Sequence, residues 1–119
     1  MKESVLKTKS YQFALEIIST YKELTLKKEY ILSKQLLRSG TSIGANIREA
    51  NNAQSKADFI HKLSISLKES DETDYWLDLL KDSSFITKEI HLKLNFQNRE
   101  INRMLISSIK TLKNNHLSK

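Results

Sequence analysis

The chemistry that this chain most clearly offers is the binding of negative charge along one face of its C-terminal segment. Four cations recur there at helical spacing and form what we call the basic stripe: Arg99, Arg103, Lys110 and Lys113. At about 100° per residue they fall within an arc of about 80°. Such a stripe could contact nucleic-acid phosphates, or it could be the solvated face of an amphipathic helix. We find neither interleaved aromatic residues nor a nucleic-acid motif beside it, so both interpretations stay open.

A second, looser group of cations lies in the first half of the chain, on a helix expected over residues 26–52. This second basic arc consists of Lys34, Arg38 and Arg48. It could extend a nucleic-acid surface. Alternatively, Arg38 and Arg48 could pair with Glu49 or with the acidic residues of the following helix.

Carboxylates offer the other candidate chemistry, which is cation binding. Aspartates recur on one face of the third expected helix and form an acidic stripe: Asp71, Asp74, Asp78 and Asp82. We favour charges that are solvated or paired with lysines, because a di-metal bundle needs two Glu-x-x-His motifs plus two more carboxylates. Only the Asp58-x-x-His61 spacing comes near that pattern. We therefore expect no metal and no cofactor. Since no Ser/His/Asp order stands out either, we expect no enzyme activity and no small-molecule substrate.

The composition favours an all-α protein. The 119 residues include no proline, so nothing obliges a long helix to stop, and the length suits a single domain over residues 1–119. The absence of cysteine suits a reducing compartment, and we expect the cytoplasm. No window approaches the roughly 20 apolar residues of a membrane-spanning helix, so we expect no membrane partner. The net charge of +6 is concentrated at the C-terminal end, since residues 101–119 contain no acid.

Apolar periodicity and capping residues predict four helices, over residues 4–24, 26–52, 55–81 and 87–113. The first is marked by an apolar stripe: Leu6, Phe13, Ile17 and Leu24. Thr25 and Thr87 offer hydroxyl N-caps, and the Ser55-x-x-Asp58 spacing has the form of a capping box. Because the connections are short, neighbouring helices should be antiparallel. We therefore predict an antiparallel up-down four-helix bundle.

The only two glycines, Gly40 and Gly44, lie inside the second expected helix, where each costs about 1 kcal/mol relative to alanine. Gly40 belongs to a core seam with alternating spacings of four and three: Leu36, Gly40, Ile43, Ile47 and Ala50. The third helix repeats this alternation with small residues in the middle: Phe59, Leu63, Ser66, Ser70, Thr73, Leu77 and Leu80. We therefore expect Gly40 to approach the level of Ser66 and Ser70, within a continuous helix that has a local kink. The alternatives are a glycine turn that splits the helix and, less favoured, a phosphate-binding loop, whose lysine and strand are missing.

Ile65 and Trp76 are eleven residues apart, so they lie on one side of the third helix, about 100° from its core seam. We therefore expect neither to be buried in the core of the monomer. Both are candidates for a subunit interface. Alternatively, Trp76 covers the edge of the bundle near the first or fourth helix.

The stretch RSGTSIGANIREA, together with AQSKADFIHKLSISLKESDETDYWLDLL after it, resembles the bacterial four-helix-bundle family of 23S rRNA-intervening sequence proteins. The signature and core residues that carry the resemblance are Gly40, Ser42, Ile43, Asn46, Ile47, Glu49, Phe59 and Leu63, followed by Glu72 and Thr73 before an aromatic residue. The resemblance is strong over residues 30–82, whereas the first and fourth helices match only in pattern.

The resemblance implies a small antiparallel bundle that commonly assembles as a homopentameric ring. Similar bundles are accessory proteins of diversity-generating retroelements, in which a basic surface meets nucleic acid and a reverse transcriptase. The family supplies no catalytic residues to carry over. We therefore expect a non-enzymatic homo-oligomer that binds RNA or a nucleoprotein. The alternative is a structural or protein-binding assembly without nucleic acid.

Overall fold

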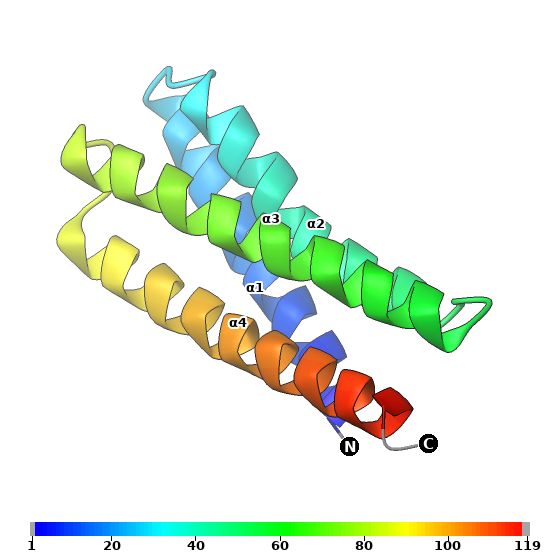
Figure 1. Ribbon diagram of the computed structural model, residues 1–119. Helices are drawn as coiled ribbons and strands as arrows, with labels where there is room; N and C mark the ends of the chain where they lie inside the picture. The colour runs from blue at the N-terminus through cyan, green and yellow to red at the C-terminus, as the bar shows by residue number, and fades with distance from the viewer. Residues whose placement is uncertain (1, 118–119) are drawn as a thin grey trace.

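Four α-helices make up the computed structural model, which describes the backbone of residues 2–117 and the side chains of residues 5–115. They are α1 (Lys2–Leu26), α2 (Leu32–Ala50), α3 (Lys56–Asp82) and α4 (Lys88–Leu117) (Figure 1). The helices lie along a long axis in a particle that measures 53 × 22 × 20 Å. The predicted all-α bundle is confirmed.

Each helix packs against the next one in the chain, and α4 packs back against α1. The contacts run in opposite directions along each pair. On α1 and α4, for example, Lys9 pairs with Glu100 and Glu16 pairs with Lys93, so ascending positions on one helix meet descending positions on the other. As a result, α1 begins and α4 ends at the same end of the bundle (Figure 1).

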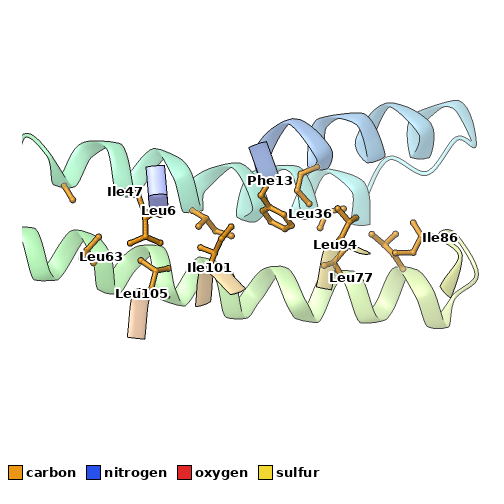
Figure 2. Close-up of a cluster of buried hydrophobic side chains, with 14 of the residues drawn as sticks. Leu6, Phe13, Leu36, Ile47, Leu63, Leu77, Ile86, Leu94, Ile101 and Leu105 are labelled. Atoms are coloured by element: carbon orange, nitrogen blue, oxygen red, sulfur yellow. The ribbon is translucent and has the colours of Figure 1, made fainter. Parts of the chain in front are cut away.

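The core is built from the apolar seams that the sequence predicts (Figure 2). Its fully buried large side chains come from all four helices: Leu6, Phe13, Ile17, Leu24, Leu36, Ile43, Leu77, Leu80, Leu94, Ile101 and Leu105. Removing one such side chain from water contributes about 1.5–3 kcal/mol to folding. This burial is the main reason that helices of low net hydropathy hold together as a bundle.

The first connection begins later than predicted, and the N-cap assigned to Thr25 is wrong. α1 continues to Leu26, and the Thr25 hydroxyl donates back to the carbonyl of Lys22 at 2.8 Å instead of capping a new helix. The chain reverses at Lys28, whose φ of 64° lies in the left-handed region. The second helix therefore starts at Leu32 rather than at residue 26.

Glu29 caps the N-terminus of α2, a role that sequence analysis missed. Its carboxylate accepts hydrogen bonds from the backbone N–H groups of Ile31 (3.3 Å), Leu32 (3.2 Å) and Ser33 (2.6 Å). Burial acts to raise the pKa of this carboxyl, but the hydrogen bonds together outweigh it and hold the pKa below its ordinary value of 4.5. Three of the N–H groups that a helix start leaves unpaired are thereby satisfied.

Glu29→Gln is expected to lower the free energy of unfolding by about 1 kcal/mol at neutral pH, the usual loss when an N-cap is weakened. Because the folded-state pKa is lowered, the charge stabilises the fold above the ordinary pKa, and this contribution is lost as the pH falls through the folded-state value. Urea denaturation of both proteins should give a constant difference above about pH 5 and a shrinking one below it. A difference that persists unchanged in strong acid would contradict this role.

The other two helix starts agree with their predicted caps. The Ser55 hydroxyl accepts from the N–H of Asp58 at 3.0 Å, while the Asp58 carboxylate accepts from the N–H of Gln54 at 3.3 Å. The Thr87 hydroxyl accepts from the N–H of Ile90 at 3.1 Å. α4 then extends to Leu117, four residues beyond the predicted end at 113.

Helix α2 passes through both glycines without interruption, and neither glycine has a positive φ. The predicted continuous helix is confirmed, the alternative glycine turn is wrong, and the local kink stays a prediction. A Cβ at Gly40 would lie 2.8 Å from Cγ1 of Ile17, so the tightest contact at this glycine is with α1, and the expected approach to the level of Ser66 and Ser70 on α3 stays a prediction. A Cβ at Gly44 would lie 3.3 Å from the carbonyl oxygen of Ser10. The glycines therefore allow α1 and α2 to approach closely.

The packing surface between α1 and α4 differs from the others. Its two ion pairs, Lys9 with Glu100 at 3.2 Å and Glu16 with Lys93 at 2.9 Å, join side chains that are substantially exposed. Two buried polar atoms on α4, Oε1 of Gln97 and the hydroxyl oxygen of Ser108, have no hydrogen-bond partner among the described residues. By helical spacing both belong to the side of α4 that carries Lys93 and Glu100.

Candidate nucleic-acid interface

A buried polar network between α3 and α4 sets how α4 is rotated. The side-chain amide of Asn98, which is fully buried, donates to the carbonyl of Ser70 at 2.9 Å and to Asp74 at 2.6 Å. The Ser70 hydroxyl donates in return to Oδ1 of Asn98 at 2.8 Å. Asn102, also buried, donates to Ser70 at 3.0 Å and to Asp71 at 2.9 Å. Buried polar groups need these partners, so the network favours one register of α4 and fixes which residues face outward.

The acidic stripe of α3 is largely paired within the chain, as we favoured from sequence. Asp74 binds Arg99 at 2.6 Å, and Asp78 binds His91 at 2.7 Å. Asp82 lies 3.8 Å from its neighbour Lys81. Among the side chains that the structure describes, no group of three or more His, Cys, Asp or Glu residues is placed to hold a metal ion.

The basic stripe of α4 remains on one face, but its members differ. Arg103, Lys110 and Lys113 are exposed, and within residues 5–115 no acidic side chain lies within ion-pair distance of them. Arg99 is half-buried and held by Asp74. Among the side chains that the structure describes, the outer face of α4 therefore presents three cations without an acidic partner and one paired cation.

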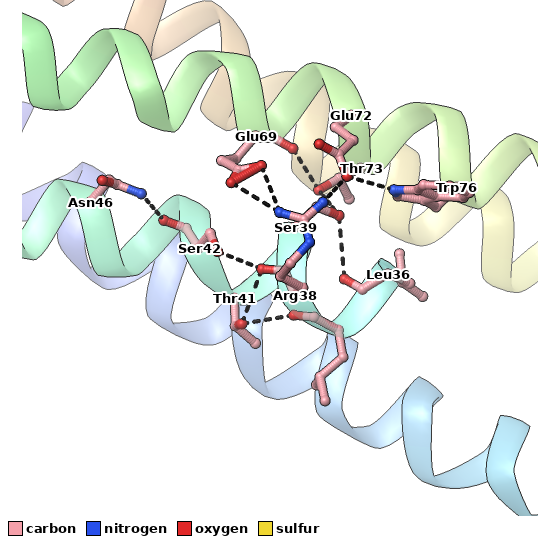
Figure 3. A network of polar contacts seen from close by, with 11 residues as sticks. Leu36, Arg38, Ser39, Thr41, Ser42, Asn46, Glu69, Glu72, Thr73 and Trp76 are labelled. Carbon is pink, nitrogen blue, oxygen red and sulfur yellow. Dashed lines mark hydrogen bonds and ion pairs between the residues drawn. The ribbon is translucent and has the colours of Figure 1, made fainter. Parts of the chain in front are cut away.

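The second basic arc does not form a comparable surface. Arg38 is engaged by the two α3 carboxylates Glu69 and Glu72, in accord with one of the alternatives left open above (Figure 3). Arg48 lies over the ring of Tyr11, with its guanidinium carbon 5.7 Å from the ring centroid. Of the three residues in this arc, Lys34 alone is exposed with no ion pair or ring contact in the described part of the chain.

Trp76 is half-buried and packs against the core without being part of it, in line with the expectation that it is not buried in the core of the monomer. Its indole N–H donates to Glu72 at 2.9 Å, and its ring packs edge-to-face against Tyr75 at 5.1 Å. Since Glu72 also binds Arg38 of α2, Trp76 covers the edge between α2 and α3, not one near α1 or α4. Ile65 is half-buried on the same side of α3, and a subunit interface through these two residues stays a prediction.

Apolar residues that were not predicted from the sequence share the outer face of α4 with the basic stripe. Leu92 is 71% exposed, Phe96 is 64% exposed and Ile106 is 49% exposed. Together with the cations they follow alternating spacings of four and three: Leu92, Phe96, Arg99, Arg103, Ile106, Lys110 and Lys113. No aromatic residue is interleaved with the cations, as stated above, but Phe96 lies at the N-terminal end of the stripe. The alternating spacing is visible in the sequence when apolar residues and charges are considered together.

The signature residues of the family resemblance hold α2 against α3. The Ile43 carbonyl accepts from the hydroxyl of Ser66 at 2.8 Å, and Thr73 contacts the hydroxyl of Ser39 at 3.0 Å. Ser42 and Asn46 bond back to carbonyls one turn earlier in α2 (Figure 3). Ile47, Phe59 and Leu63 pack in or against the core. Glu49 instead pairs with Lys62 of α3 at 3.3 Å. Their role in this molecule is structural.

Comparison with known proteins agrees with the fold and the signature. Residues 2–107 match the model of the family described as 23S rRNA-intervening sequence protein. The crystal structure of a protein with unknown function from the S23 ribosomal protein family of Bacteroides thetaiotaomicron VPI-5482 superposes with a TM-score of 0.91. That protein is 57% identical, and the alignment covers 92% of this chain and 99% of the other. No curated protein matches the chain.

Membrane crossing finds no support in the described residues, since none of their helices combines the necessary length with sufficient apolar content. The family match extends over most of the chain, including α1 and most of α4, which resembled the family only in pattern. The solved relative shares the fold at high sequence identity. On these grounds the chain belongs to the 23S rRNA-intervening sequence protein family.

Proposed function

We propose that this protein is a non-enzymatic, homo-oligomeric binding protein of the cytoplasm, in which the basic stripe of α4 binds RNA or a nucleoprotein. The observation that carries the proposal is the set of exposed cations on the outer face of α4 that have no acidic partner among residues 5–115: Arg103, Lys110 and Lys113. The family description, which names an intervening sequence of 23S rRNA, suits an RNA partner.

The cations of the basic stripe share one face of a single helix, and three of them have no acidic neighbour among the described residues. Arg38, Lys62, Lys93 and Arg99 are each within reach of a carboxylate of the same chain, which already neutralises part of their charge, whereas exposed cations such as Lys7, Lys22 and Lys28 have no ion pair among the described residues but do not lie on the face of α4. Arg103, Lys110 and Lys113 have no such neighbour in the described part of the chain. Cations without an acidic partner are those that phosphates can neutralise with release of counterions.

A purely protein-binding assembly is the second candidate, and the exposed apolar residues of α4 favour it. Leu92, Phe96 and Ile106 are large apolar side chains that are exposed together on one helix face, and such a patch is typical of a protein-binding surface. In this candidate the basic excess keeps the particle soluble. Both candidates include self-association, for which we propose the pentameric ring that the family resemblance implies, with Ile65 and Trp76 as interface candidates.

Replacement of Arg103, Lys110 and Lys113 by Glu is expected to abolish retention of RNA at low salt and to flatten the salt dependence of binding. Each phosphate contact to a single strand contributes a slope of about 0.7 in log affinity against log salt, so three lost contacts lower the slope by about 2. Gel filtration coupled to light scattering, with the absorbance ratio recorded across the peak at low and high salt, measures cargo and particle mass together.

The matched control replaces three exposed lysines at the α1 side of the bundle, Lys7, Lys22 and Lys28, by Glu. It changes the net charge about as much as the test variant but leaves the basic stripe intact, so RNA binding should be retained. Equal loss in both variants would show that only net charge matters. A clean oligomer that never carries RNA, even at low salt, would refute the proposal and support the protein-binding candidate.

A further inference from the structure

Phe96 lies in line with two of the free cations of the basic stripe. Phe96, Arg103 and Lys110 follow one another at intervals of seven residues, which is about two helical turns or about 10.5 Å along the axis. All three side chains are exposed. The outer face of α4 thus carries an exposed aromatic ring at one end of a row of positive charges that no described acidic side chain compensates.

This arrangement fits an unpaired base and its flanking phosphates better than it fits a duplex. In an A-form duplex the bases are stacked within the helix, and its deep, narrow major groove excludes side chains. An aromatic ring on the convex surface of an α-helix would therefore find no base face there. In a single strand the bases are free to stack on such a ring, while the backbone follows a row of cations.

The aromatic ring also indicates a partner that offers more than phosphates to this surface. Phosphate binding needs cations, and three are present without Phe96. Phe96 is 64% exposed on the same face as the cations, and exposure of its apolar ring to water is unfavourable. One base stacked on the ring would cover it. The positive charge of the row complements phosphates, and Arg99, held by Asp74 one turn from Phe96, leaves the remaining three cations to meet them.

We propose that α4 binds single-stranded RNA, with one base stacked on Phe96 and the adjoining phosphates on Arg103 and Lys110. This inference rests on the proposed function and narrows its partner to unpaired RNA. Phe96 supplies the preference for a single strand, and the cations supply affinity that does not depend on sequence.

The test compares binding of a fluorescent oligouridine with binding of an RNA duplex of the same length, by anisotropy at low salt. The intact protein should prefer the single strand. Phe96→Ala should weaken binding of the single strand about tenfold, within the range for loss of one base–aromatic stack, and leave duplex binding unchanged. Phe96→Trp should retain the preference. Leu92→Ala is the matched control, because Leu92 is as exposed on the same face but cannot stack, and it should change affinity by less than about twofold.

The outcomes separate this inference from the proposed function. If the triple Glu variant loses RNA while Phe96→Ala keeps full affinity for the single strand, the proposed function stands and the stacking role of Phe96 is refuted. Equal affinity of the intact protein for single strand and duplex would also refute it. If no RNA binds at all, both proposals fail. If Phe96→Ala and Leu92→Ala both lower the particle mass in light scattering, this face covers a second copy of the chain and the inference is overturned.

Discussion

Asn98→Asp is expected to cost about 3–5 kcal/mol of unfolding free energy at neutral pH, the range for a buried charge left without compensation. The substitution hardly changes the shape of the side chain. It replaces an amide that donates to Asp74 at 2.6 Å and to the Ser70 carbonyl at 2.9 Å by an oxygen that can only repel both. Asn98 is fully buried, so water cannot screen the repulsion. Urea denaturation followed by circular dichroism measures the loss.

The pH dependence of the unfolding free energy shows whether the buried charge causes the loss. Burial and the neighbouring Asp74 should raise the pKa of the introduced carboxyl, so its protonation relieves the repulsion and the deficit narrows as the pH falls toward about 4. Asn95→Asp is the matched control, since Asn95 donates to the same Asp74 oxygen at 3.3 Å but is partly exposed. It should cost no more than about 1 kcal/mol. Similar losses in the two variants would show that the buried network does not position α4.

Gly40→Ala is expected to destabilise the bundle by about 2 kcal/mol, although alanine is the better helix former by about 1 kcal/mol. The added methyl group would lie 2.8 Å and 2.9 Å from Cγ1 and Cγ2 of Ile17. Those atoms are branched directly from the Cβ of a side chain that is fully buried, so they cannot swing aside. Thermal and urea denaturation of the variant give the loss.

Two further variants test the proposed clash. Gly44→Ala meets Ser10 at 3.3 Å, a contact that a small shift relieves, so its stability should stay within about 1 kcal/mol of the parent. Ile17→Ala removes both clashing carbons, and in that background Gly40→Ala should become neutral or stabilising. A double-mutant cycle with no coupling between positions 17 and 40 would exclude the close approach of α1 to α2 as the reason for the glycine.

The seams of the bundle could be predicted from the sequence, because burial imposes the helical period on apolar residues. Leu36, Gly40 and Ile43 are buried as their spacing indicates. What the spacing could not supply is the partner of each seam residue. Gly40 lies between two neighbouring helices, and the rotation of α2 decides that its tightest contact is with Ile17. That rotation depends on the packing of the whole core.

Helix ends and the candidate site were harder to predict from the sequence, because they too depend on contacts between helices. A threonine hydroxyl before a helical segment can cap that segment or donate to a carbonyl of the preceding turn. The Thr25 hydroxyl donates to the carbonyl of Lys22, and the carboxylate of Glu29 accepts from the free N–H groups at the start of α2 instead. Charges on the basic stripe could be placed on one face, but that Arg99 is held by Asp74 depends on contact between helices. Phe96 was available from the sequence, at a spacing of seven from Arg103, once aromatic residues and charges are followed together.

The weak side of the bundle between α1 and α4 implies unequal resistance to opening. Across it, exposed ion pairs contribute little, and two buried polar atoms of α4 lack partners in the described structure. The α3 side of α4, by contrast, is closed by the buried Asn98 and Asn102 network. Local unfolding should therefore begin with the separation of α1 from α4, and amides along this contact should exchange their hydrogens with solvent before those of α3. Because α4 stays docked on α3 in that open form, the outer face of α4 keeps its shape while the contact between α1 and α4 opens and closes.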